Sequence, residues 1–257
     1  MTKSIAVASL CSVLFFLPII AHAQTDAEKQ AELDRKEAAT KGTGLDPTEV
    51  IGRIEFNYTY SEFKDGAVRH SGILVLDKDI SDTSVVGVEV PLATAEAADG
   101  NRTNGIGDVK ISFKSRIYSE GKFSTSMGAG LSFDTATDDG LGDDYNSVRL
   151  GMFNAYKHGE WLFAAINGLN ITEEEEENSI NIVPLIAYQP MGKYISYATV
   201  AFPYAYRFDS GDSVTTAFFH LGKVMANKDV YSLGTKINID GPDTEDFVLF
   251  LGYRRLF

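Results

Sequence analysis

Runs of alternating polar and apolar residues fill the chain from residue 50 onward, and they constrain its fold more than any other feature. In residues 53–60, Ile, Phe and Tyr take every second position, and Arg, Glu, Asn and Thr take the positions between. Residues 109–117, 123–133 and 230–239 repeat this pattern. Because side chains alternate across a β-strand, the pattern predicts strands with one apolar and one polar face.

Residues 50–257 divide into about twelve such runs, most of them near the length of a tilted membrane-spanning strand. The runs cover residues 51–60, 69–76, 84–92, 109–118, 123–133, 148–156, 161–170, 180–188, 194–206, 214–225, 230–239 and 247–257. Short connections alternate with long ones, as in outer-membrane barrels. We therefore expect an all-β chain that folds as a transmembrane, antiparallel, up-and-down β-barrel with both termini on the periplasmic side.

The last run, residues 247–257, favours a closed sheet. An apolar strand at an open edge invites aggregation, whereas pairing with the first strand closes a barrel. The run resembles the C-terminal signal that the barrel-assembly machinery recognises, with Gly252 and Phe257 at its expected positions. Arg255 departs from that signal, since an apolar residue is usual there. The alternative is the final strand of a soluble β-protein.

Residues 1–23 have the features of a secretory signal peptide. Lys3 precedes an apolar stretch, and Ala21-His-Ala23 fits a cleavage site. The stretch is shorter than the ~20 residues of a transmembrane helix. The single cysteine, Cys11, lies inside it, so we expect the mature chain to contain no disulfide.

Residues 24–49 differ in composition from the rest of the chain. They are rich in helix-forming residues, and residues 25–41 contain one large apolar side chain, Leu33. A segment with so little to bury is predicted to be helical or disordered in the periplasm. The alternatives are a short coiled coil or a plug for the barrel.

Acidic residues give the chain a formal net charge of −13 and concentrate in the long connections. Such a chain is a poor candidate for binding nucleic acid. One acidic cluster, considered as a weak divalent-cation site that could bridge to lipid phosphates, comprises Asp138, Asp139, Asp143 and Asp144. Its spacing does not match an EF-hand loop, so solvated loops are the favoured interpretation.

Charged residues on the polar strand faces are candidates for lining a pore. They are Arg53, Glu55, Glu89, Lys110, Lys114, Arg116 and Lys236. Their balance predicts a narrow, anion-leaning channel or a cavity for carboxylated aromatic compounds. The alternative is a ladder of salt bridges that fills a closed barrel, since about twelve strands is intermediate between packed and open barrels.

The sequence contains no motif for nucleophilic catalysis, phosphate binding or a Cys/His metal site, so no enzyme activity and no cofactor are expected. His70, His158 and His220 are the histidines after residue 23. An outer-membrane lipase would need a Ser–His pair. Ser71 follows His70 and so points to the opposite face of the strand. Thr216, near His220, is the other local hydroxyl.

Residues 105–118 begin Gly-Ile-Gly-Asp, follow a run that ends Val-Glu-Val-Pro-Leu at residues 88–92, and precede Gly-Ala-Gly-Leu-Ser-Phe-Asp at residues 128–134. This arrangement resembles the outer-membrane family named for the meta-pathway of phenol degradation. The resemblance implies a barrel that acts as a channel or transporter, in a family with some members encoded near aromatic catabolism. Residues 133–136 (Phe-Asp-Thr-Ala) replace the Pro-Thr-Gly that is usual after the fifth strand.

The function that the sequence favours is passive uptake of small solutes, anionic or aromatic, through an outer-membrane channel. The expected partners are outer-membrane lipid, the barrel-assembly machinery and a small-molecule solute. The first alternative is a non-conducting structural barrel, or one whose loops mediate an interaction. An outer-membrane lipase is the third.

Overall fold

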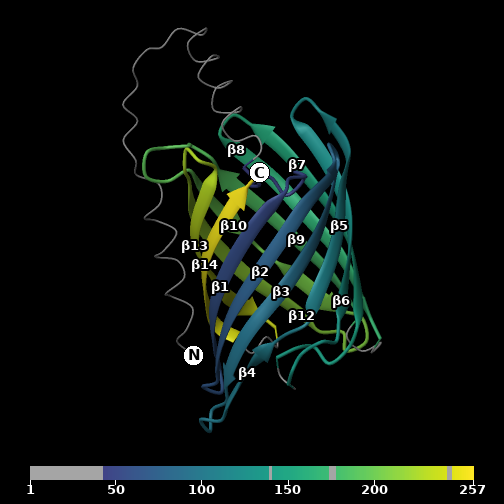
Figure 1. Ribbon diagram of the computed structural model, residues 1–257, viewed down its shortest axis with the longest axis vertical. Helices are drawn as coiled ribbons and strands as arrows, with labels where there is room; N and C mark the ends of the chain where they lie inside the picture. Colours follow the sequence, from purple (N-terminus) through teal and green to yellow (C-terminus); the bar gives the residue numbers. More distant parts are fainter. Residues whose placement is uncertain (1–42, 139–140, 174–177, 242–244) are drawn as a thin grey trace.

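The computed structural model describes residues 43–138, 141–173, 178–241 and 245–257, which form one antiparallel sheet that closes on itself (Figure 1). The strands of its first half are β1 (Arg53–Phe63), β2 (Val68–Ser81), β3 (Ser84–Glu96), β4 (Arg102–Ile106), β5 (Val109–Glu120), β6 (Phe123–Phe133) and β7 (Ser147–His158). Those of the second half are β8 (Trp161–Thr172), β9 (Ser179–Tyr188), β10 (Tyr197–Ala201), β11 (Tyr204–Arg207), β12 (Ser213–Val224), β13 (Asp229–Asp240) and β14 (Glu245–Leu256). Within these residues there is no helix with the length and hydropathy to cross a bilayer.

Two pairs of these strands are successive parts of one barrel strand. β4 and β5 both pair with β3, and β10 and β11 both pair with β9 and β12. The barrel therefore has twelve strands, as the sequence predicts. The predicted signal peptide and most of the predicted N-terminal segment, residues 24–42, lie outside the described residues.

Pairing between the first and last strands closes the sheet. Arg53 pairs with Leu256, and the register continues to the Phe63–Glu245 pair with one irregularity near the end. This confirms that the last run completes a barrel. A closed sheet has no unpaired edge, so every strand satisfies its backbone hydrogen bonds with neighbours, which a membrane-spanning sheet requires.

The two faces of the sheet differ as the alternation predicts. On β1, Ile54 and Phe56 point outward and are 40% and 44% exposed, whereas Glu55 points inward and is buried. Large apolar side chains continue this outer belt on β5, β7, β8 and β13, among others. An outer apolar surface around a closed sheet is the arrangement that suits a lipid environment.

The short connections lie at the end of the barrel that also holds the end of β14, and we call this the turn end. The long connections lie at the opposite end, the loop end. β4 extends beyond the main wall at the loop end (Figure 1). One short connection, residues 189–196, departs from the prediction, because the expected strand began at residue 194 and β10 begins at Tyr197.

The strand formed by β10 and β11 is interrupted at Phe202 and Pro203, because proline has no N–H to donate to the ladder. The neighbouring strands still bridge the interruption. The Phe202 N–H donates to the carbonyl oxygen of Pro184 at 3.0 Å, and the Thr216 N–H donates to that of Pro203 at 2.9 Å. The wall thus stays closed where the sequence predicted one continuous strand.

Candidate functional site in the barrel lumen

The lumen contains a chamber of about 460 Å³ between two segments that fold inward, one at each end of the barrel. Its wall is formed mainly by β1–β3, β5–β7 and β14. The lining combines charged side chains with small polar ones. A concave space with converging polar groups is the default candidate for solute binding or passage.

The segment at the turn end is residues 43–52, which we call the inner strap. Ser126 donates its hydroxyl to the carbonyl oxygen of Thr48 at 2.7 Å, and the hydroxyls of Thr48 and Ser124 lie 2.6 Å apart. Because Ser124 and Ser126 are on the polar face of β6, these contacts place the strap inside the barrel. Thr48 is 1% exposed, so the strap is enclosed and does not lie on the rim.

Ion pairs and apolar contacts hold the strap from several strands. Lys157 of β7 lies 3.2 Å from Asp46 and 3.8 Å from Glu49. Arg254 of β14 donates to the carbonyl oxygen of Gly44 at 2.9 Å. Leu45 and Ile51 pack against the buried cluster of Tyr197, Val230 and Leu256. The strap thus narrows the lumen at the turn end.

The predicted helical or disordered segment, residues 24–49, overlaps this strap at residues 43–49. Those residues contain turns and no helix. Their position corresponds to the plug that the sequence offered as an alternative. No sequence pattern indicates this position, because the strap has only a few apolar residues and no periodicity.

The segment at the loop end is the connection between β6 and β7, and Asp108 holds it in place. One carboxylate oxygen of Asp108 accepts the N–H groups of Thr135 and Ala136 at 3.1 and 3.2 Å, and the other accepts that of Asp143 at 2.7 Å. Asp108 is only 4% exposed, so these bonds satisfy a buried charge. The connection consequently folds against the inner side of the wall.

Two glycines of the Gly-Ile-Gly-Asp element make this fold possible. A Cβ on Gly105 would lie 1.9 Å from the hydroxyl of Thr137, and one on Gly107 would lie 2.7 Å from the carbonyl oxygen of Leu141. Both distances are too short for any side chain. The element that carries the family resemblance therefore has a local role, which is to let the β6–β7 connection approach the wall.

Most of the charged side chains in the chamber form ion pairs. Arg254 binds Glu55 through two nitrogen atoms, each 2.9 Å from a carboxylate oxygen. Arg53 lies 3.1 Å from Glu55, and its Nε lies 2.7 Å from Asp77 but off the N–H direction, so that contact is ionic and not a hydrogen bond. These contacts form a charged ladder across β2, β1 and β14, which is the alternative that the sequence left open.

Two cations of the chamber lie outside that ladder. Lys114 and Arg149 have no carboxylate within ion-pair distance among the described residues. Lys114 donates to the carbonyl oxygen of Pro47 at 3.4 Å and lies 5.7 Å from the ring centre of Phe153. Lys110 is 3.7 Å from Glu89. The ladder therefore does not use all of the positive charge.

The wall beside these cations is made of small residues. The inward side chains of β6 are those of Ser124, Ser126, Gly128, Gly130 and Ser132. Its neighbours β5 and β7 carry the longer inward side chains of Lys114, Arg149 and Phe153, so β6 forms a recess between them. This recess provides much of the space in the chamber.

An aromatic cluster faces the lumen from β10, β12 and β14. Phe218 packs edge-on against Phe250, with ring centres 5.3 Å apart. His220 lies against Phe218 and Tyr197 at 5.5 and 5.4 Å. The lumen therefore has a charged side and an aromatic side.

Five of the seven predicted pore-lining residues line the chamber, namely Arg53, Glu55, Glu89, Lys110 and Lys114. Arg116 faces the lumen nearer the turn end, opposite Ser126. Lys236 forms an ion pair with Glu245 near the loop end. The seven predicted residues did not include Asp77, Asp143, Arg149 or Arg254, which also line the chamber. Alternation along β7 and β14 would have indicated the inward position of Arg149 and Arg254.

The sequence also raised a Ser–His pair at His70 and a weak divalent-cation site in the acidic cluster. The Nδ1 of His70 is 2.6 Å from the hydroxyl of Tyr58, and Ser71 points to the other face of β2. Of the acidic cluster, Asp139 lies outside the described residues. No group of three or more acidic, His or Cys side chains placed to hold a metal ion occurs within the part of the chain that the structure describes.

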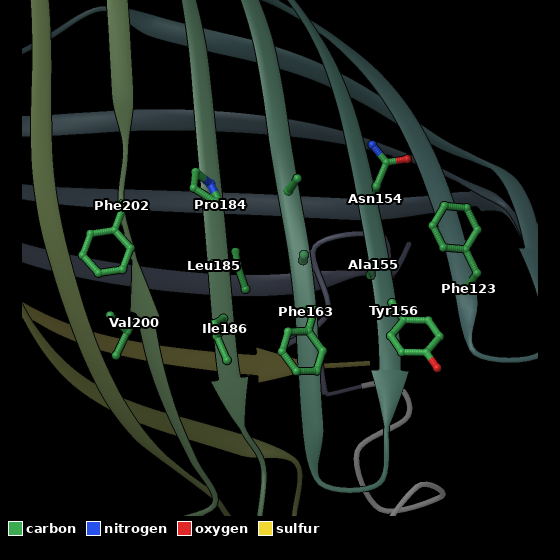
Figure 2. A pocket seen from close by; sticks show the side chains of 12 residues that line it. Phe123, Asn154, Ala155, Tyr156, Phe163, Pro184, Leu185, Ile186, Val200 and Phe202 are labelled. Carbon is green, nitrogen blue, oxygen red and sulfur yellow. The ribbon is translucent and has the colours of Figure 1, made fainter. Parts of the chain in front are cut away.

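The outer wall carries a shallow apolar groove, shown in Figure 2, across β6–β10. Its side chains include Phe123, Tyr156, Phe163, Ile186, Val200 and Phe202. Asn154 is its polar member, and it accepts a hydrogen bond from the Thr125 hydroxyl at 3.0 Å. A polar pair of this kind satisfies its own hydrogen bond within an apolar belt.

Comparison with known proteins supports the barrel assignment at the level of fold. The outer-membrane channel COG4313 from Pseudomonas putida F1 has 15% identity and a TM-score of 0.68, with coverage of 81% of this chain and 96% of that one. The shared fold is a closed antiparallel barrel of the outer-membrane type. The KdgM porin has 10% identity and a TM-score of 0.56, with coverage of 80% and 99%. The β-domain of the Bordetella autotransporter BrkA has 9% identity and a TM-score of 0.51, with coverage of 81% and 100%.

No family model and no curated protein sequence matches the chain. The resemblance to the family named for the meta-pathway of phenol degradation therefore stays a prediction. The structural neighbours show that the chain shares the barrel architecture of outer-membrane channels and porins.

Proposed function

We propose that the protein is an outer-membrane channel that passes small solutes through its lumen. The loop end faces the exterior, and the turn end faces the periplasm with both termini. The observation that carries this proposal is the chamber of about 460 Å³ inside a closed wall, with polar groups inward and an apolar belt outward. A barrel with only a structural role would gain stability by filling that space with packed side chains.

The free cations support a preference for anions. The chamber is lined by five cationic and four acidic side chains, and the ladder of ion pairs neutralises most of them. Lys114 and Arg149 form no ion pair within the described residues, and they place positive charge next to the recess of β6. Charge that lines a narrow, low-dielectric passage selects ions of the opposite sign. A solved structure of the similarly folded KdgM porin is in complex with disordered oligogalacturonate, which is consistent with a solute-passing role for this architecture.

Export and assembly complete the proposal. Residues 1–23 direct the chain out of the cytoplasm and are removed. Gly252 and Phe257 then contribute to recognition by the barrel-assembly machinery. The outer belt, including the groove of Figure 2, contacts lipid in the mature protein.

Osmotic swelling of proteoliposomes tests the proposal. We expect vesicles that contain the refolded protein to swell faster in arabinose than protein-free vesicles do, and to swell no faster in the larger sugar raffinose, because the strap and the β6–β7 connection narrow the lumen. Equal rates with and without protein in arabinose would contradict a channel.

The second candidate is a non-conducting barrel whose loops mediate an interaction. One observation favours it, because the strap and the β6–β7 connection narrow the two ends of the lumen. The swelling assay separates the two candidates, provided that heat-modifiable migration on a gel shows the barrel to be folded.

A further inference from the structure

The chamber combines free positive charge, free hydrogen-bonding groups and restricted ends, which together describe a binding site. We propose that it binds a small hydroxylated carboxylate, with Lys114 and Arg149 holding the carboxylate group. This inference rests on the proposed function, because it names the class of solute that the channel selects.

The strand register places the two cations around the recess of β6. Lys114 pairs across the sheet with Gly128, which in turn pairs with Gly151. Arg149 lies on the inward face of β7, two residues from Gly151, and pairs with Gly130. From strand spacing and rise, the Cα atoms of Lys114 and Arg149 are ~12 Å apart. Both side chains are long enough to reach a ligand that lies over Gly130, where a Cβ would meet only the carbonyl oxygen of Ile111, at 3.6 Å.

The ring of Phe153 forms one side of this recess. A Cβ on Gly128 or on Gly151 would lie 3.3 Å from the ring, so the ring lies flat over both glycines. The Lys114 ammonium group sits near the ring face at 5.7 Å, which fixes its position in the chamber. Larger residues at positions 128 and 151 would displace the ring and close the recess.

Lys114 retains donors for a ligand. An ammonium group has three N–H donors, and Lys114 directs one toward the carbonyl oxygen of Pro47. A carboxylate next to Lys114 would therefore lie directly above the inner strap. The carboxylates of the strap, Asp46 and Glu49, lie 3.2 and 3.8 Å from Lys157, and this pairing reduces their repulsion of a bound anion.

Small polar side chains around the cations suit a hydroxylated ligand. Ser112, Ser132, Ser147, Asn57 and Asn170 line the same chamber. The Ser132 hydroxyl is buried and has no hydrogen-bond partner among the residues described. A buried hydroxyl without a partner is unfavourable, and a ligand hydroxyl would satisfy it.

Of the four acidic groups that line the chamber, Glu55 and Asp77 are bound in the ladder, and the other two limit where an anion can bind. Glu89 is 3.7 Å from Lys110, so each partly neutralises the other. Asp143 belongs to the β6–β7 connection, which borders the chamber at the loop end. The site for a carboxylate is consequently the deeper half of the chamber, next to Lys114.

Isothermal titration calorimetry on the refolded barrel in detergent tests this site with defined probes. Gluconate carries the carboxylate and the hydroxyls, and sorbitol has the same carbon chain without the charge. We expect gluconate to bind and sorbitol to bind at least about ten-fold more weakly, since loss of a charge-assisted contact costs about 1.4 kcal/mol or more. Acetate, which lacks the hydroxyls, should also bind more weakly than gluconate.

The double variant Lys114→Met, Arg149→Met should lower the affinity for gluconate by about ten-fold or more. The control Lys122→Met removes one charge from an exposed turn outside the chamber and should leave the affinity unchanged. Heat-modifiable migration shows whether each variant is folded. If the double variant does not fold, the single variant Arg149→Met replaces it, because the Arg149 side chain makes no ion pair within the described part of the chain.

Equal binding of gluconate and sorbitol, no gluconate binding, or unchanged affinity in the folded double variant would overturn the site. The outcomes separate the two proposals. Binding without arabinose swelling would retain the site and reject the channel. Swelling without gluconate binding would retain the channel and reject the site.

Discussion

Arg254 and Arg255 are adjacent on β14 but face opposite sides of the wall, so they provide a matched test of how the lumen is stabilised. Arg254 binds both carboxylate oxygens of Glu55 at 2.9 Å and the carbonyl oxygen of Gly44 at 2.9 Å. The side chain of Arg255 is 57% exposed and lies 3.9 Å from Asp229. Methionine at either position removes the charge and keeps much of the length.

The expected cost of Arg254→Met follows from the contacts it removes. Breaking a buried ion pair costs about 3–5 kcal/mol when the remaining charge has no partner. Glu55 keeps Arg53 at 3.1 Å and Asn57 at 3.0 Å, which reduces this cost to about 2 kcal/mol. Loss of the bond to the strap adds about 1 kcal/mol. We therefore expect a total loss of about 3 kcal/mol for Arg254→Met and less than about 1 kcal/mol for Arg255→Met.

Urea unfolding of both variants in lipid vesicles measures this difference. The single tryptophan, Trp161, packs against Tyr188 on the outer face and reports loss of the barrel through its fluorescence. Reversibility is checked by coincident folding and unfolding curves, because a free energy requires equilibrium. If the two variants lose the same stability to within about 1 kcal/mol, the ladder is not what holds β1, β14 and the strap together.

Three further changes test other parts of the structure. Lys157→Met removes the ion pairs of Asp46, so the strap should loosen and single-channel conductance should rise; unchanged conductance would show that the strap does not limit the lumen. Gly222→Ala places a methyl group 2.2 Å from the Tyr197 ring, so the yield of heat-modifiable barrel should fall sharply, whereas a normal yield would contradict the packing there. Asp108→Ala removes three hydrogen bonds from the β6–β7 connection, so proteolysis there should become faster than in the unmodified protein.

The barrel itself could be predicted because membrane strands repeat a simple two-residue pattern. Ile54 and Phe56 alternate with Arg53 and Glu55, and the structure places the two pairs on opposite faces. The last run was predicted to pair with the first, and it does. The alternation predicts which face of each strand points outward, because a one-residue shift in register would expose every polar side chain to the apolar surroundings.

The interior was less predictable, because it depends on contacts between residues distant in sequence. Asp46 and Lys157 meet only after the barrel has closed around the strap. The strap itself is irregular and follows no period, so no pattern marks it. Lys114 was recognised as a lumen residue, but whether it was paired or free depended on where Arg53, Arg254 and their acidic partners lay.

The Gly-Ile-Gly-Asp element shows a different limit. Its residues were recognised as a family feature, and their role became clear only from the position of the β6–β7 connection. Asp108 bonds to backbone groups 27 to 35 residues later in the chain. Strand alternation concerns neighbours in sequence, so it cannot report a contact of that kind.

In the proposed channel, ions and small solutes cross the lumen past the positive charge of Lys114 and Arg149. Single-channel recording of the refolded mature protein in a planar bilayer, with a potassium chloride gradient, tests it most directly. If the channel prefers anions, we expect discrete conductance steps and a reversal potential displaced toward the chloride equilibrium potential. No conductance from a demonstrably folded barrel, or a reversal potential displaced toward the potassium equilibrium potential, would contradict an anion-preferring channel.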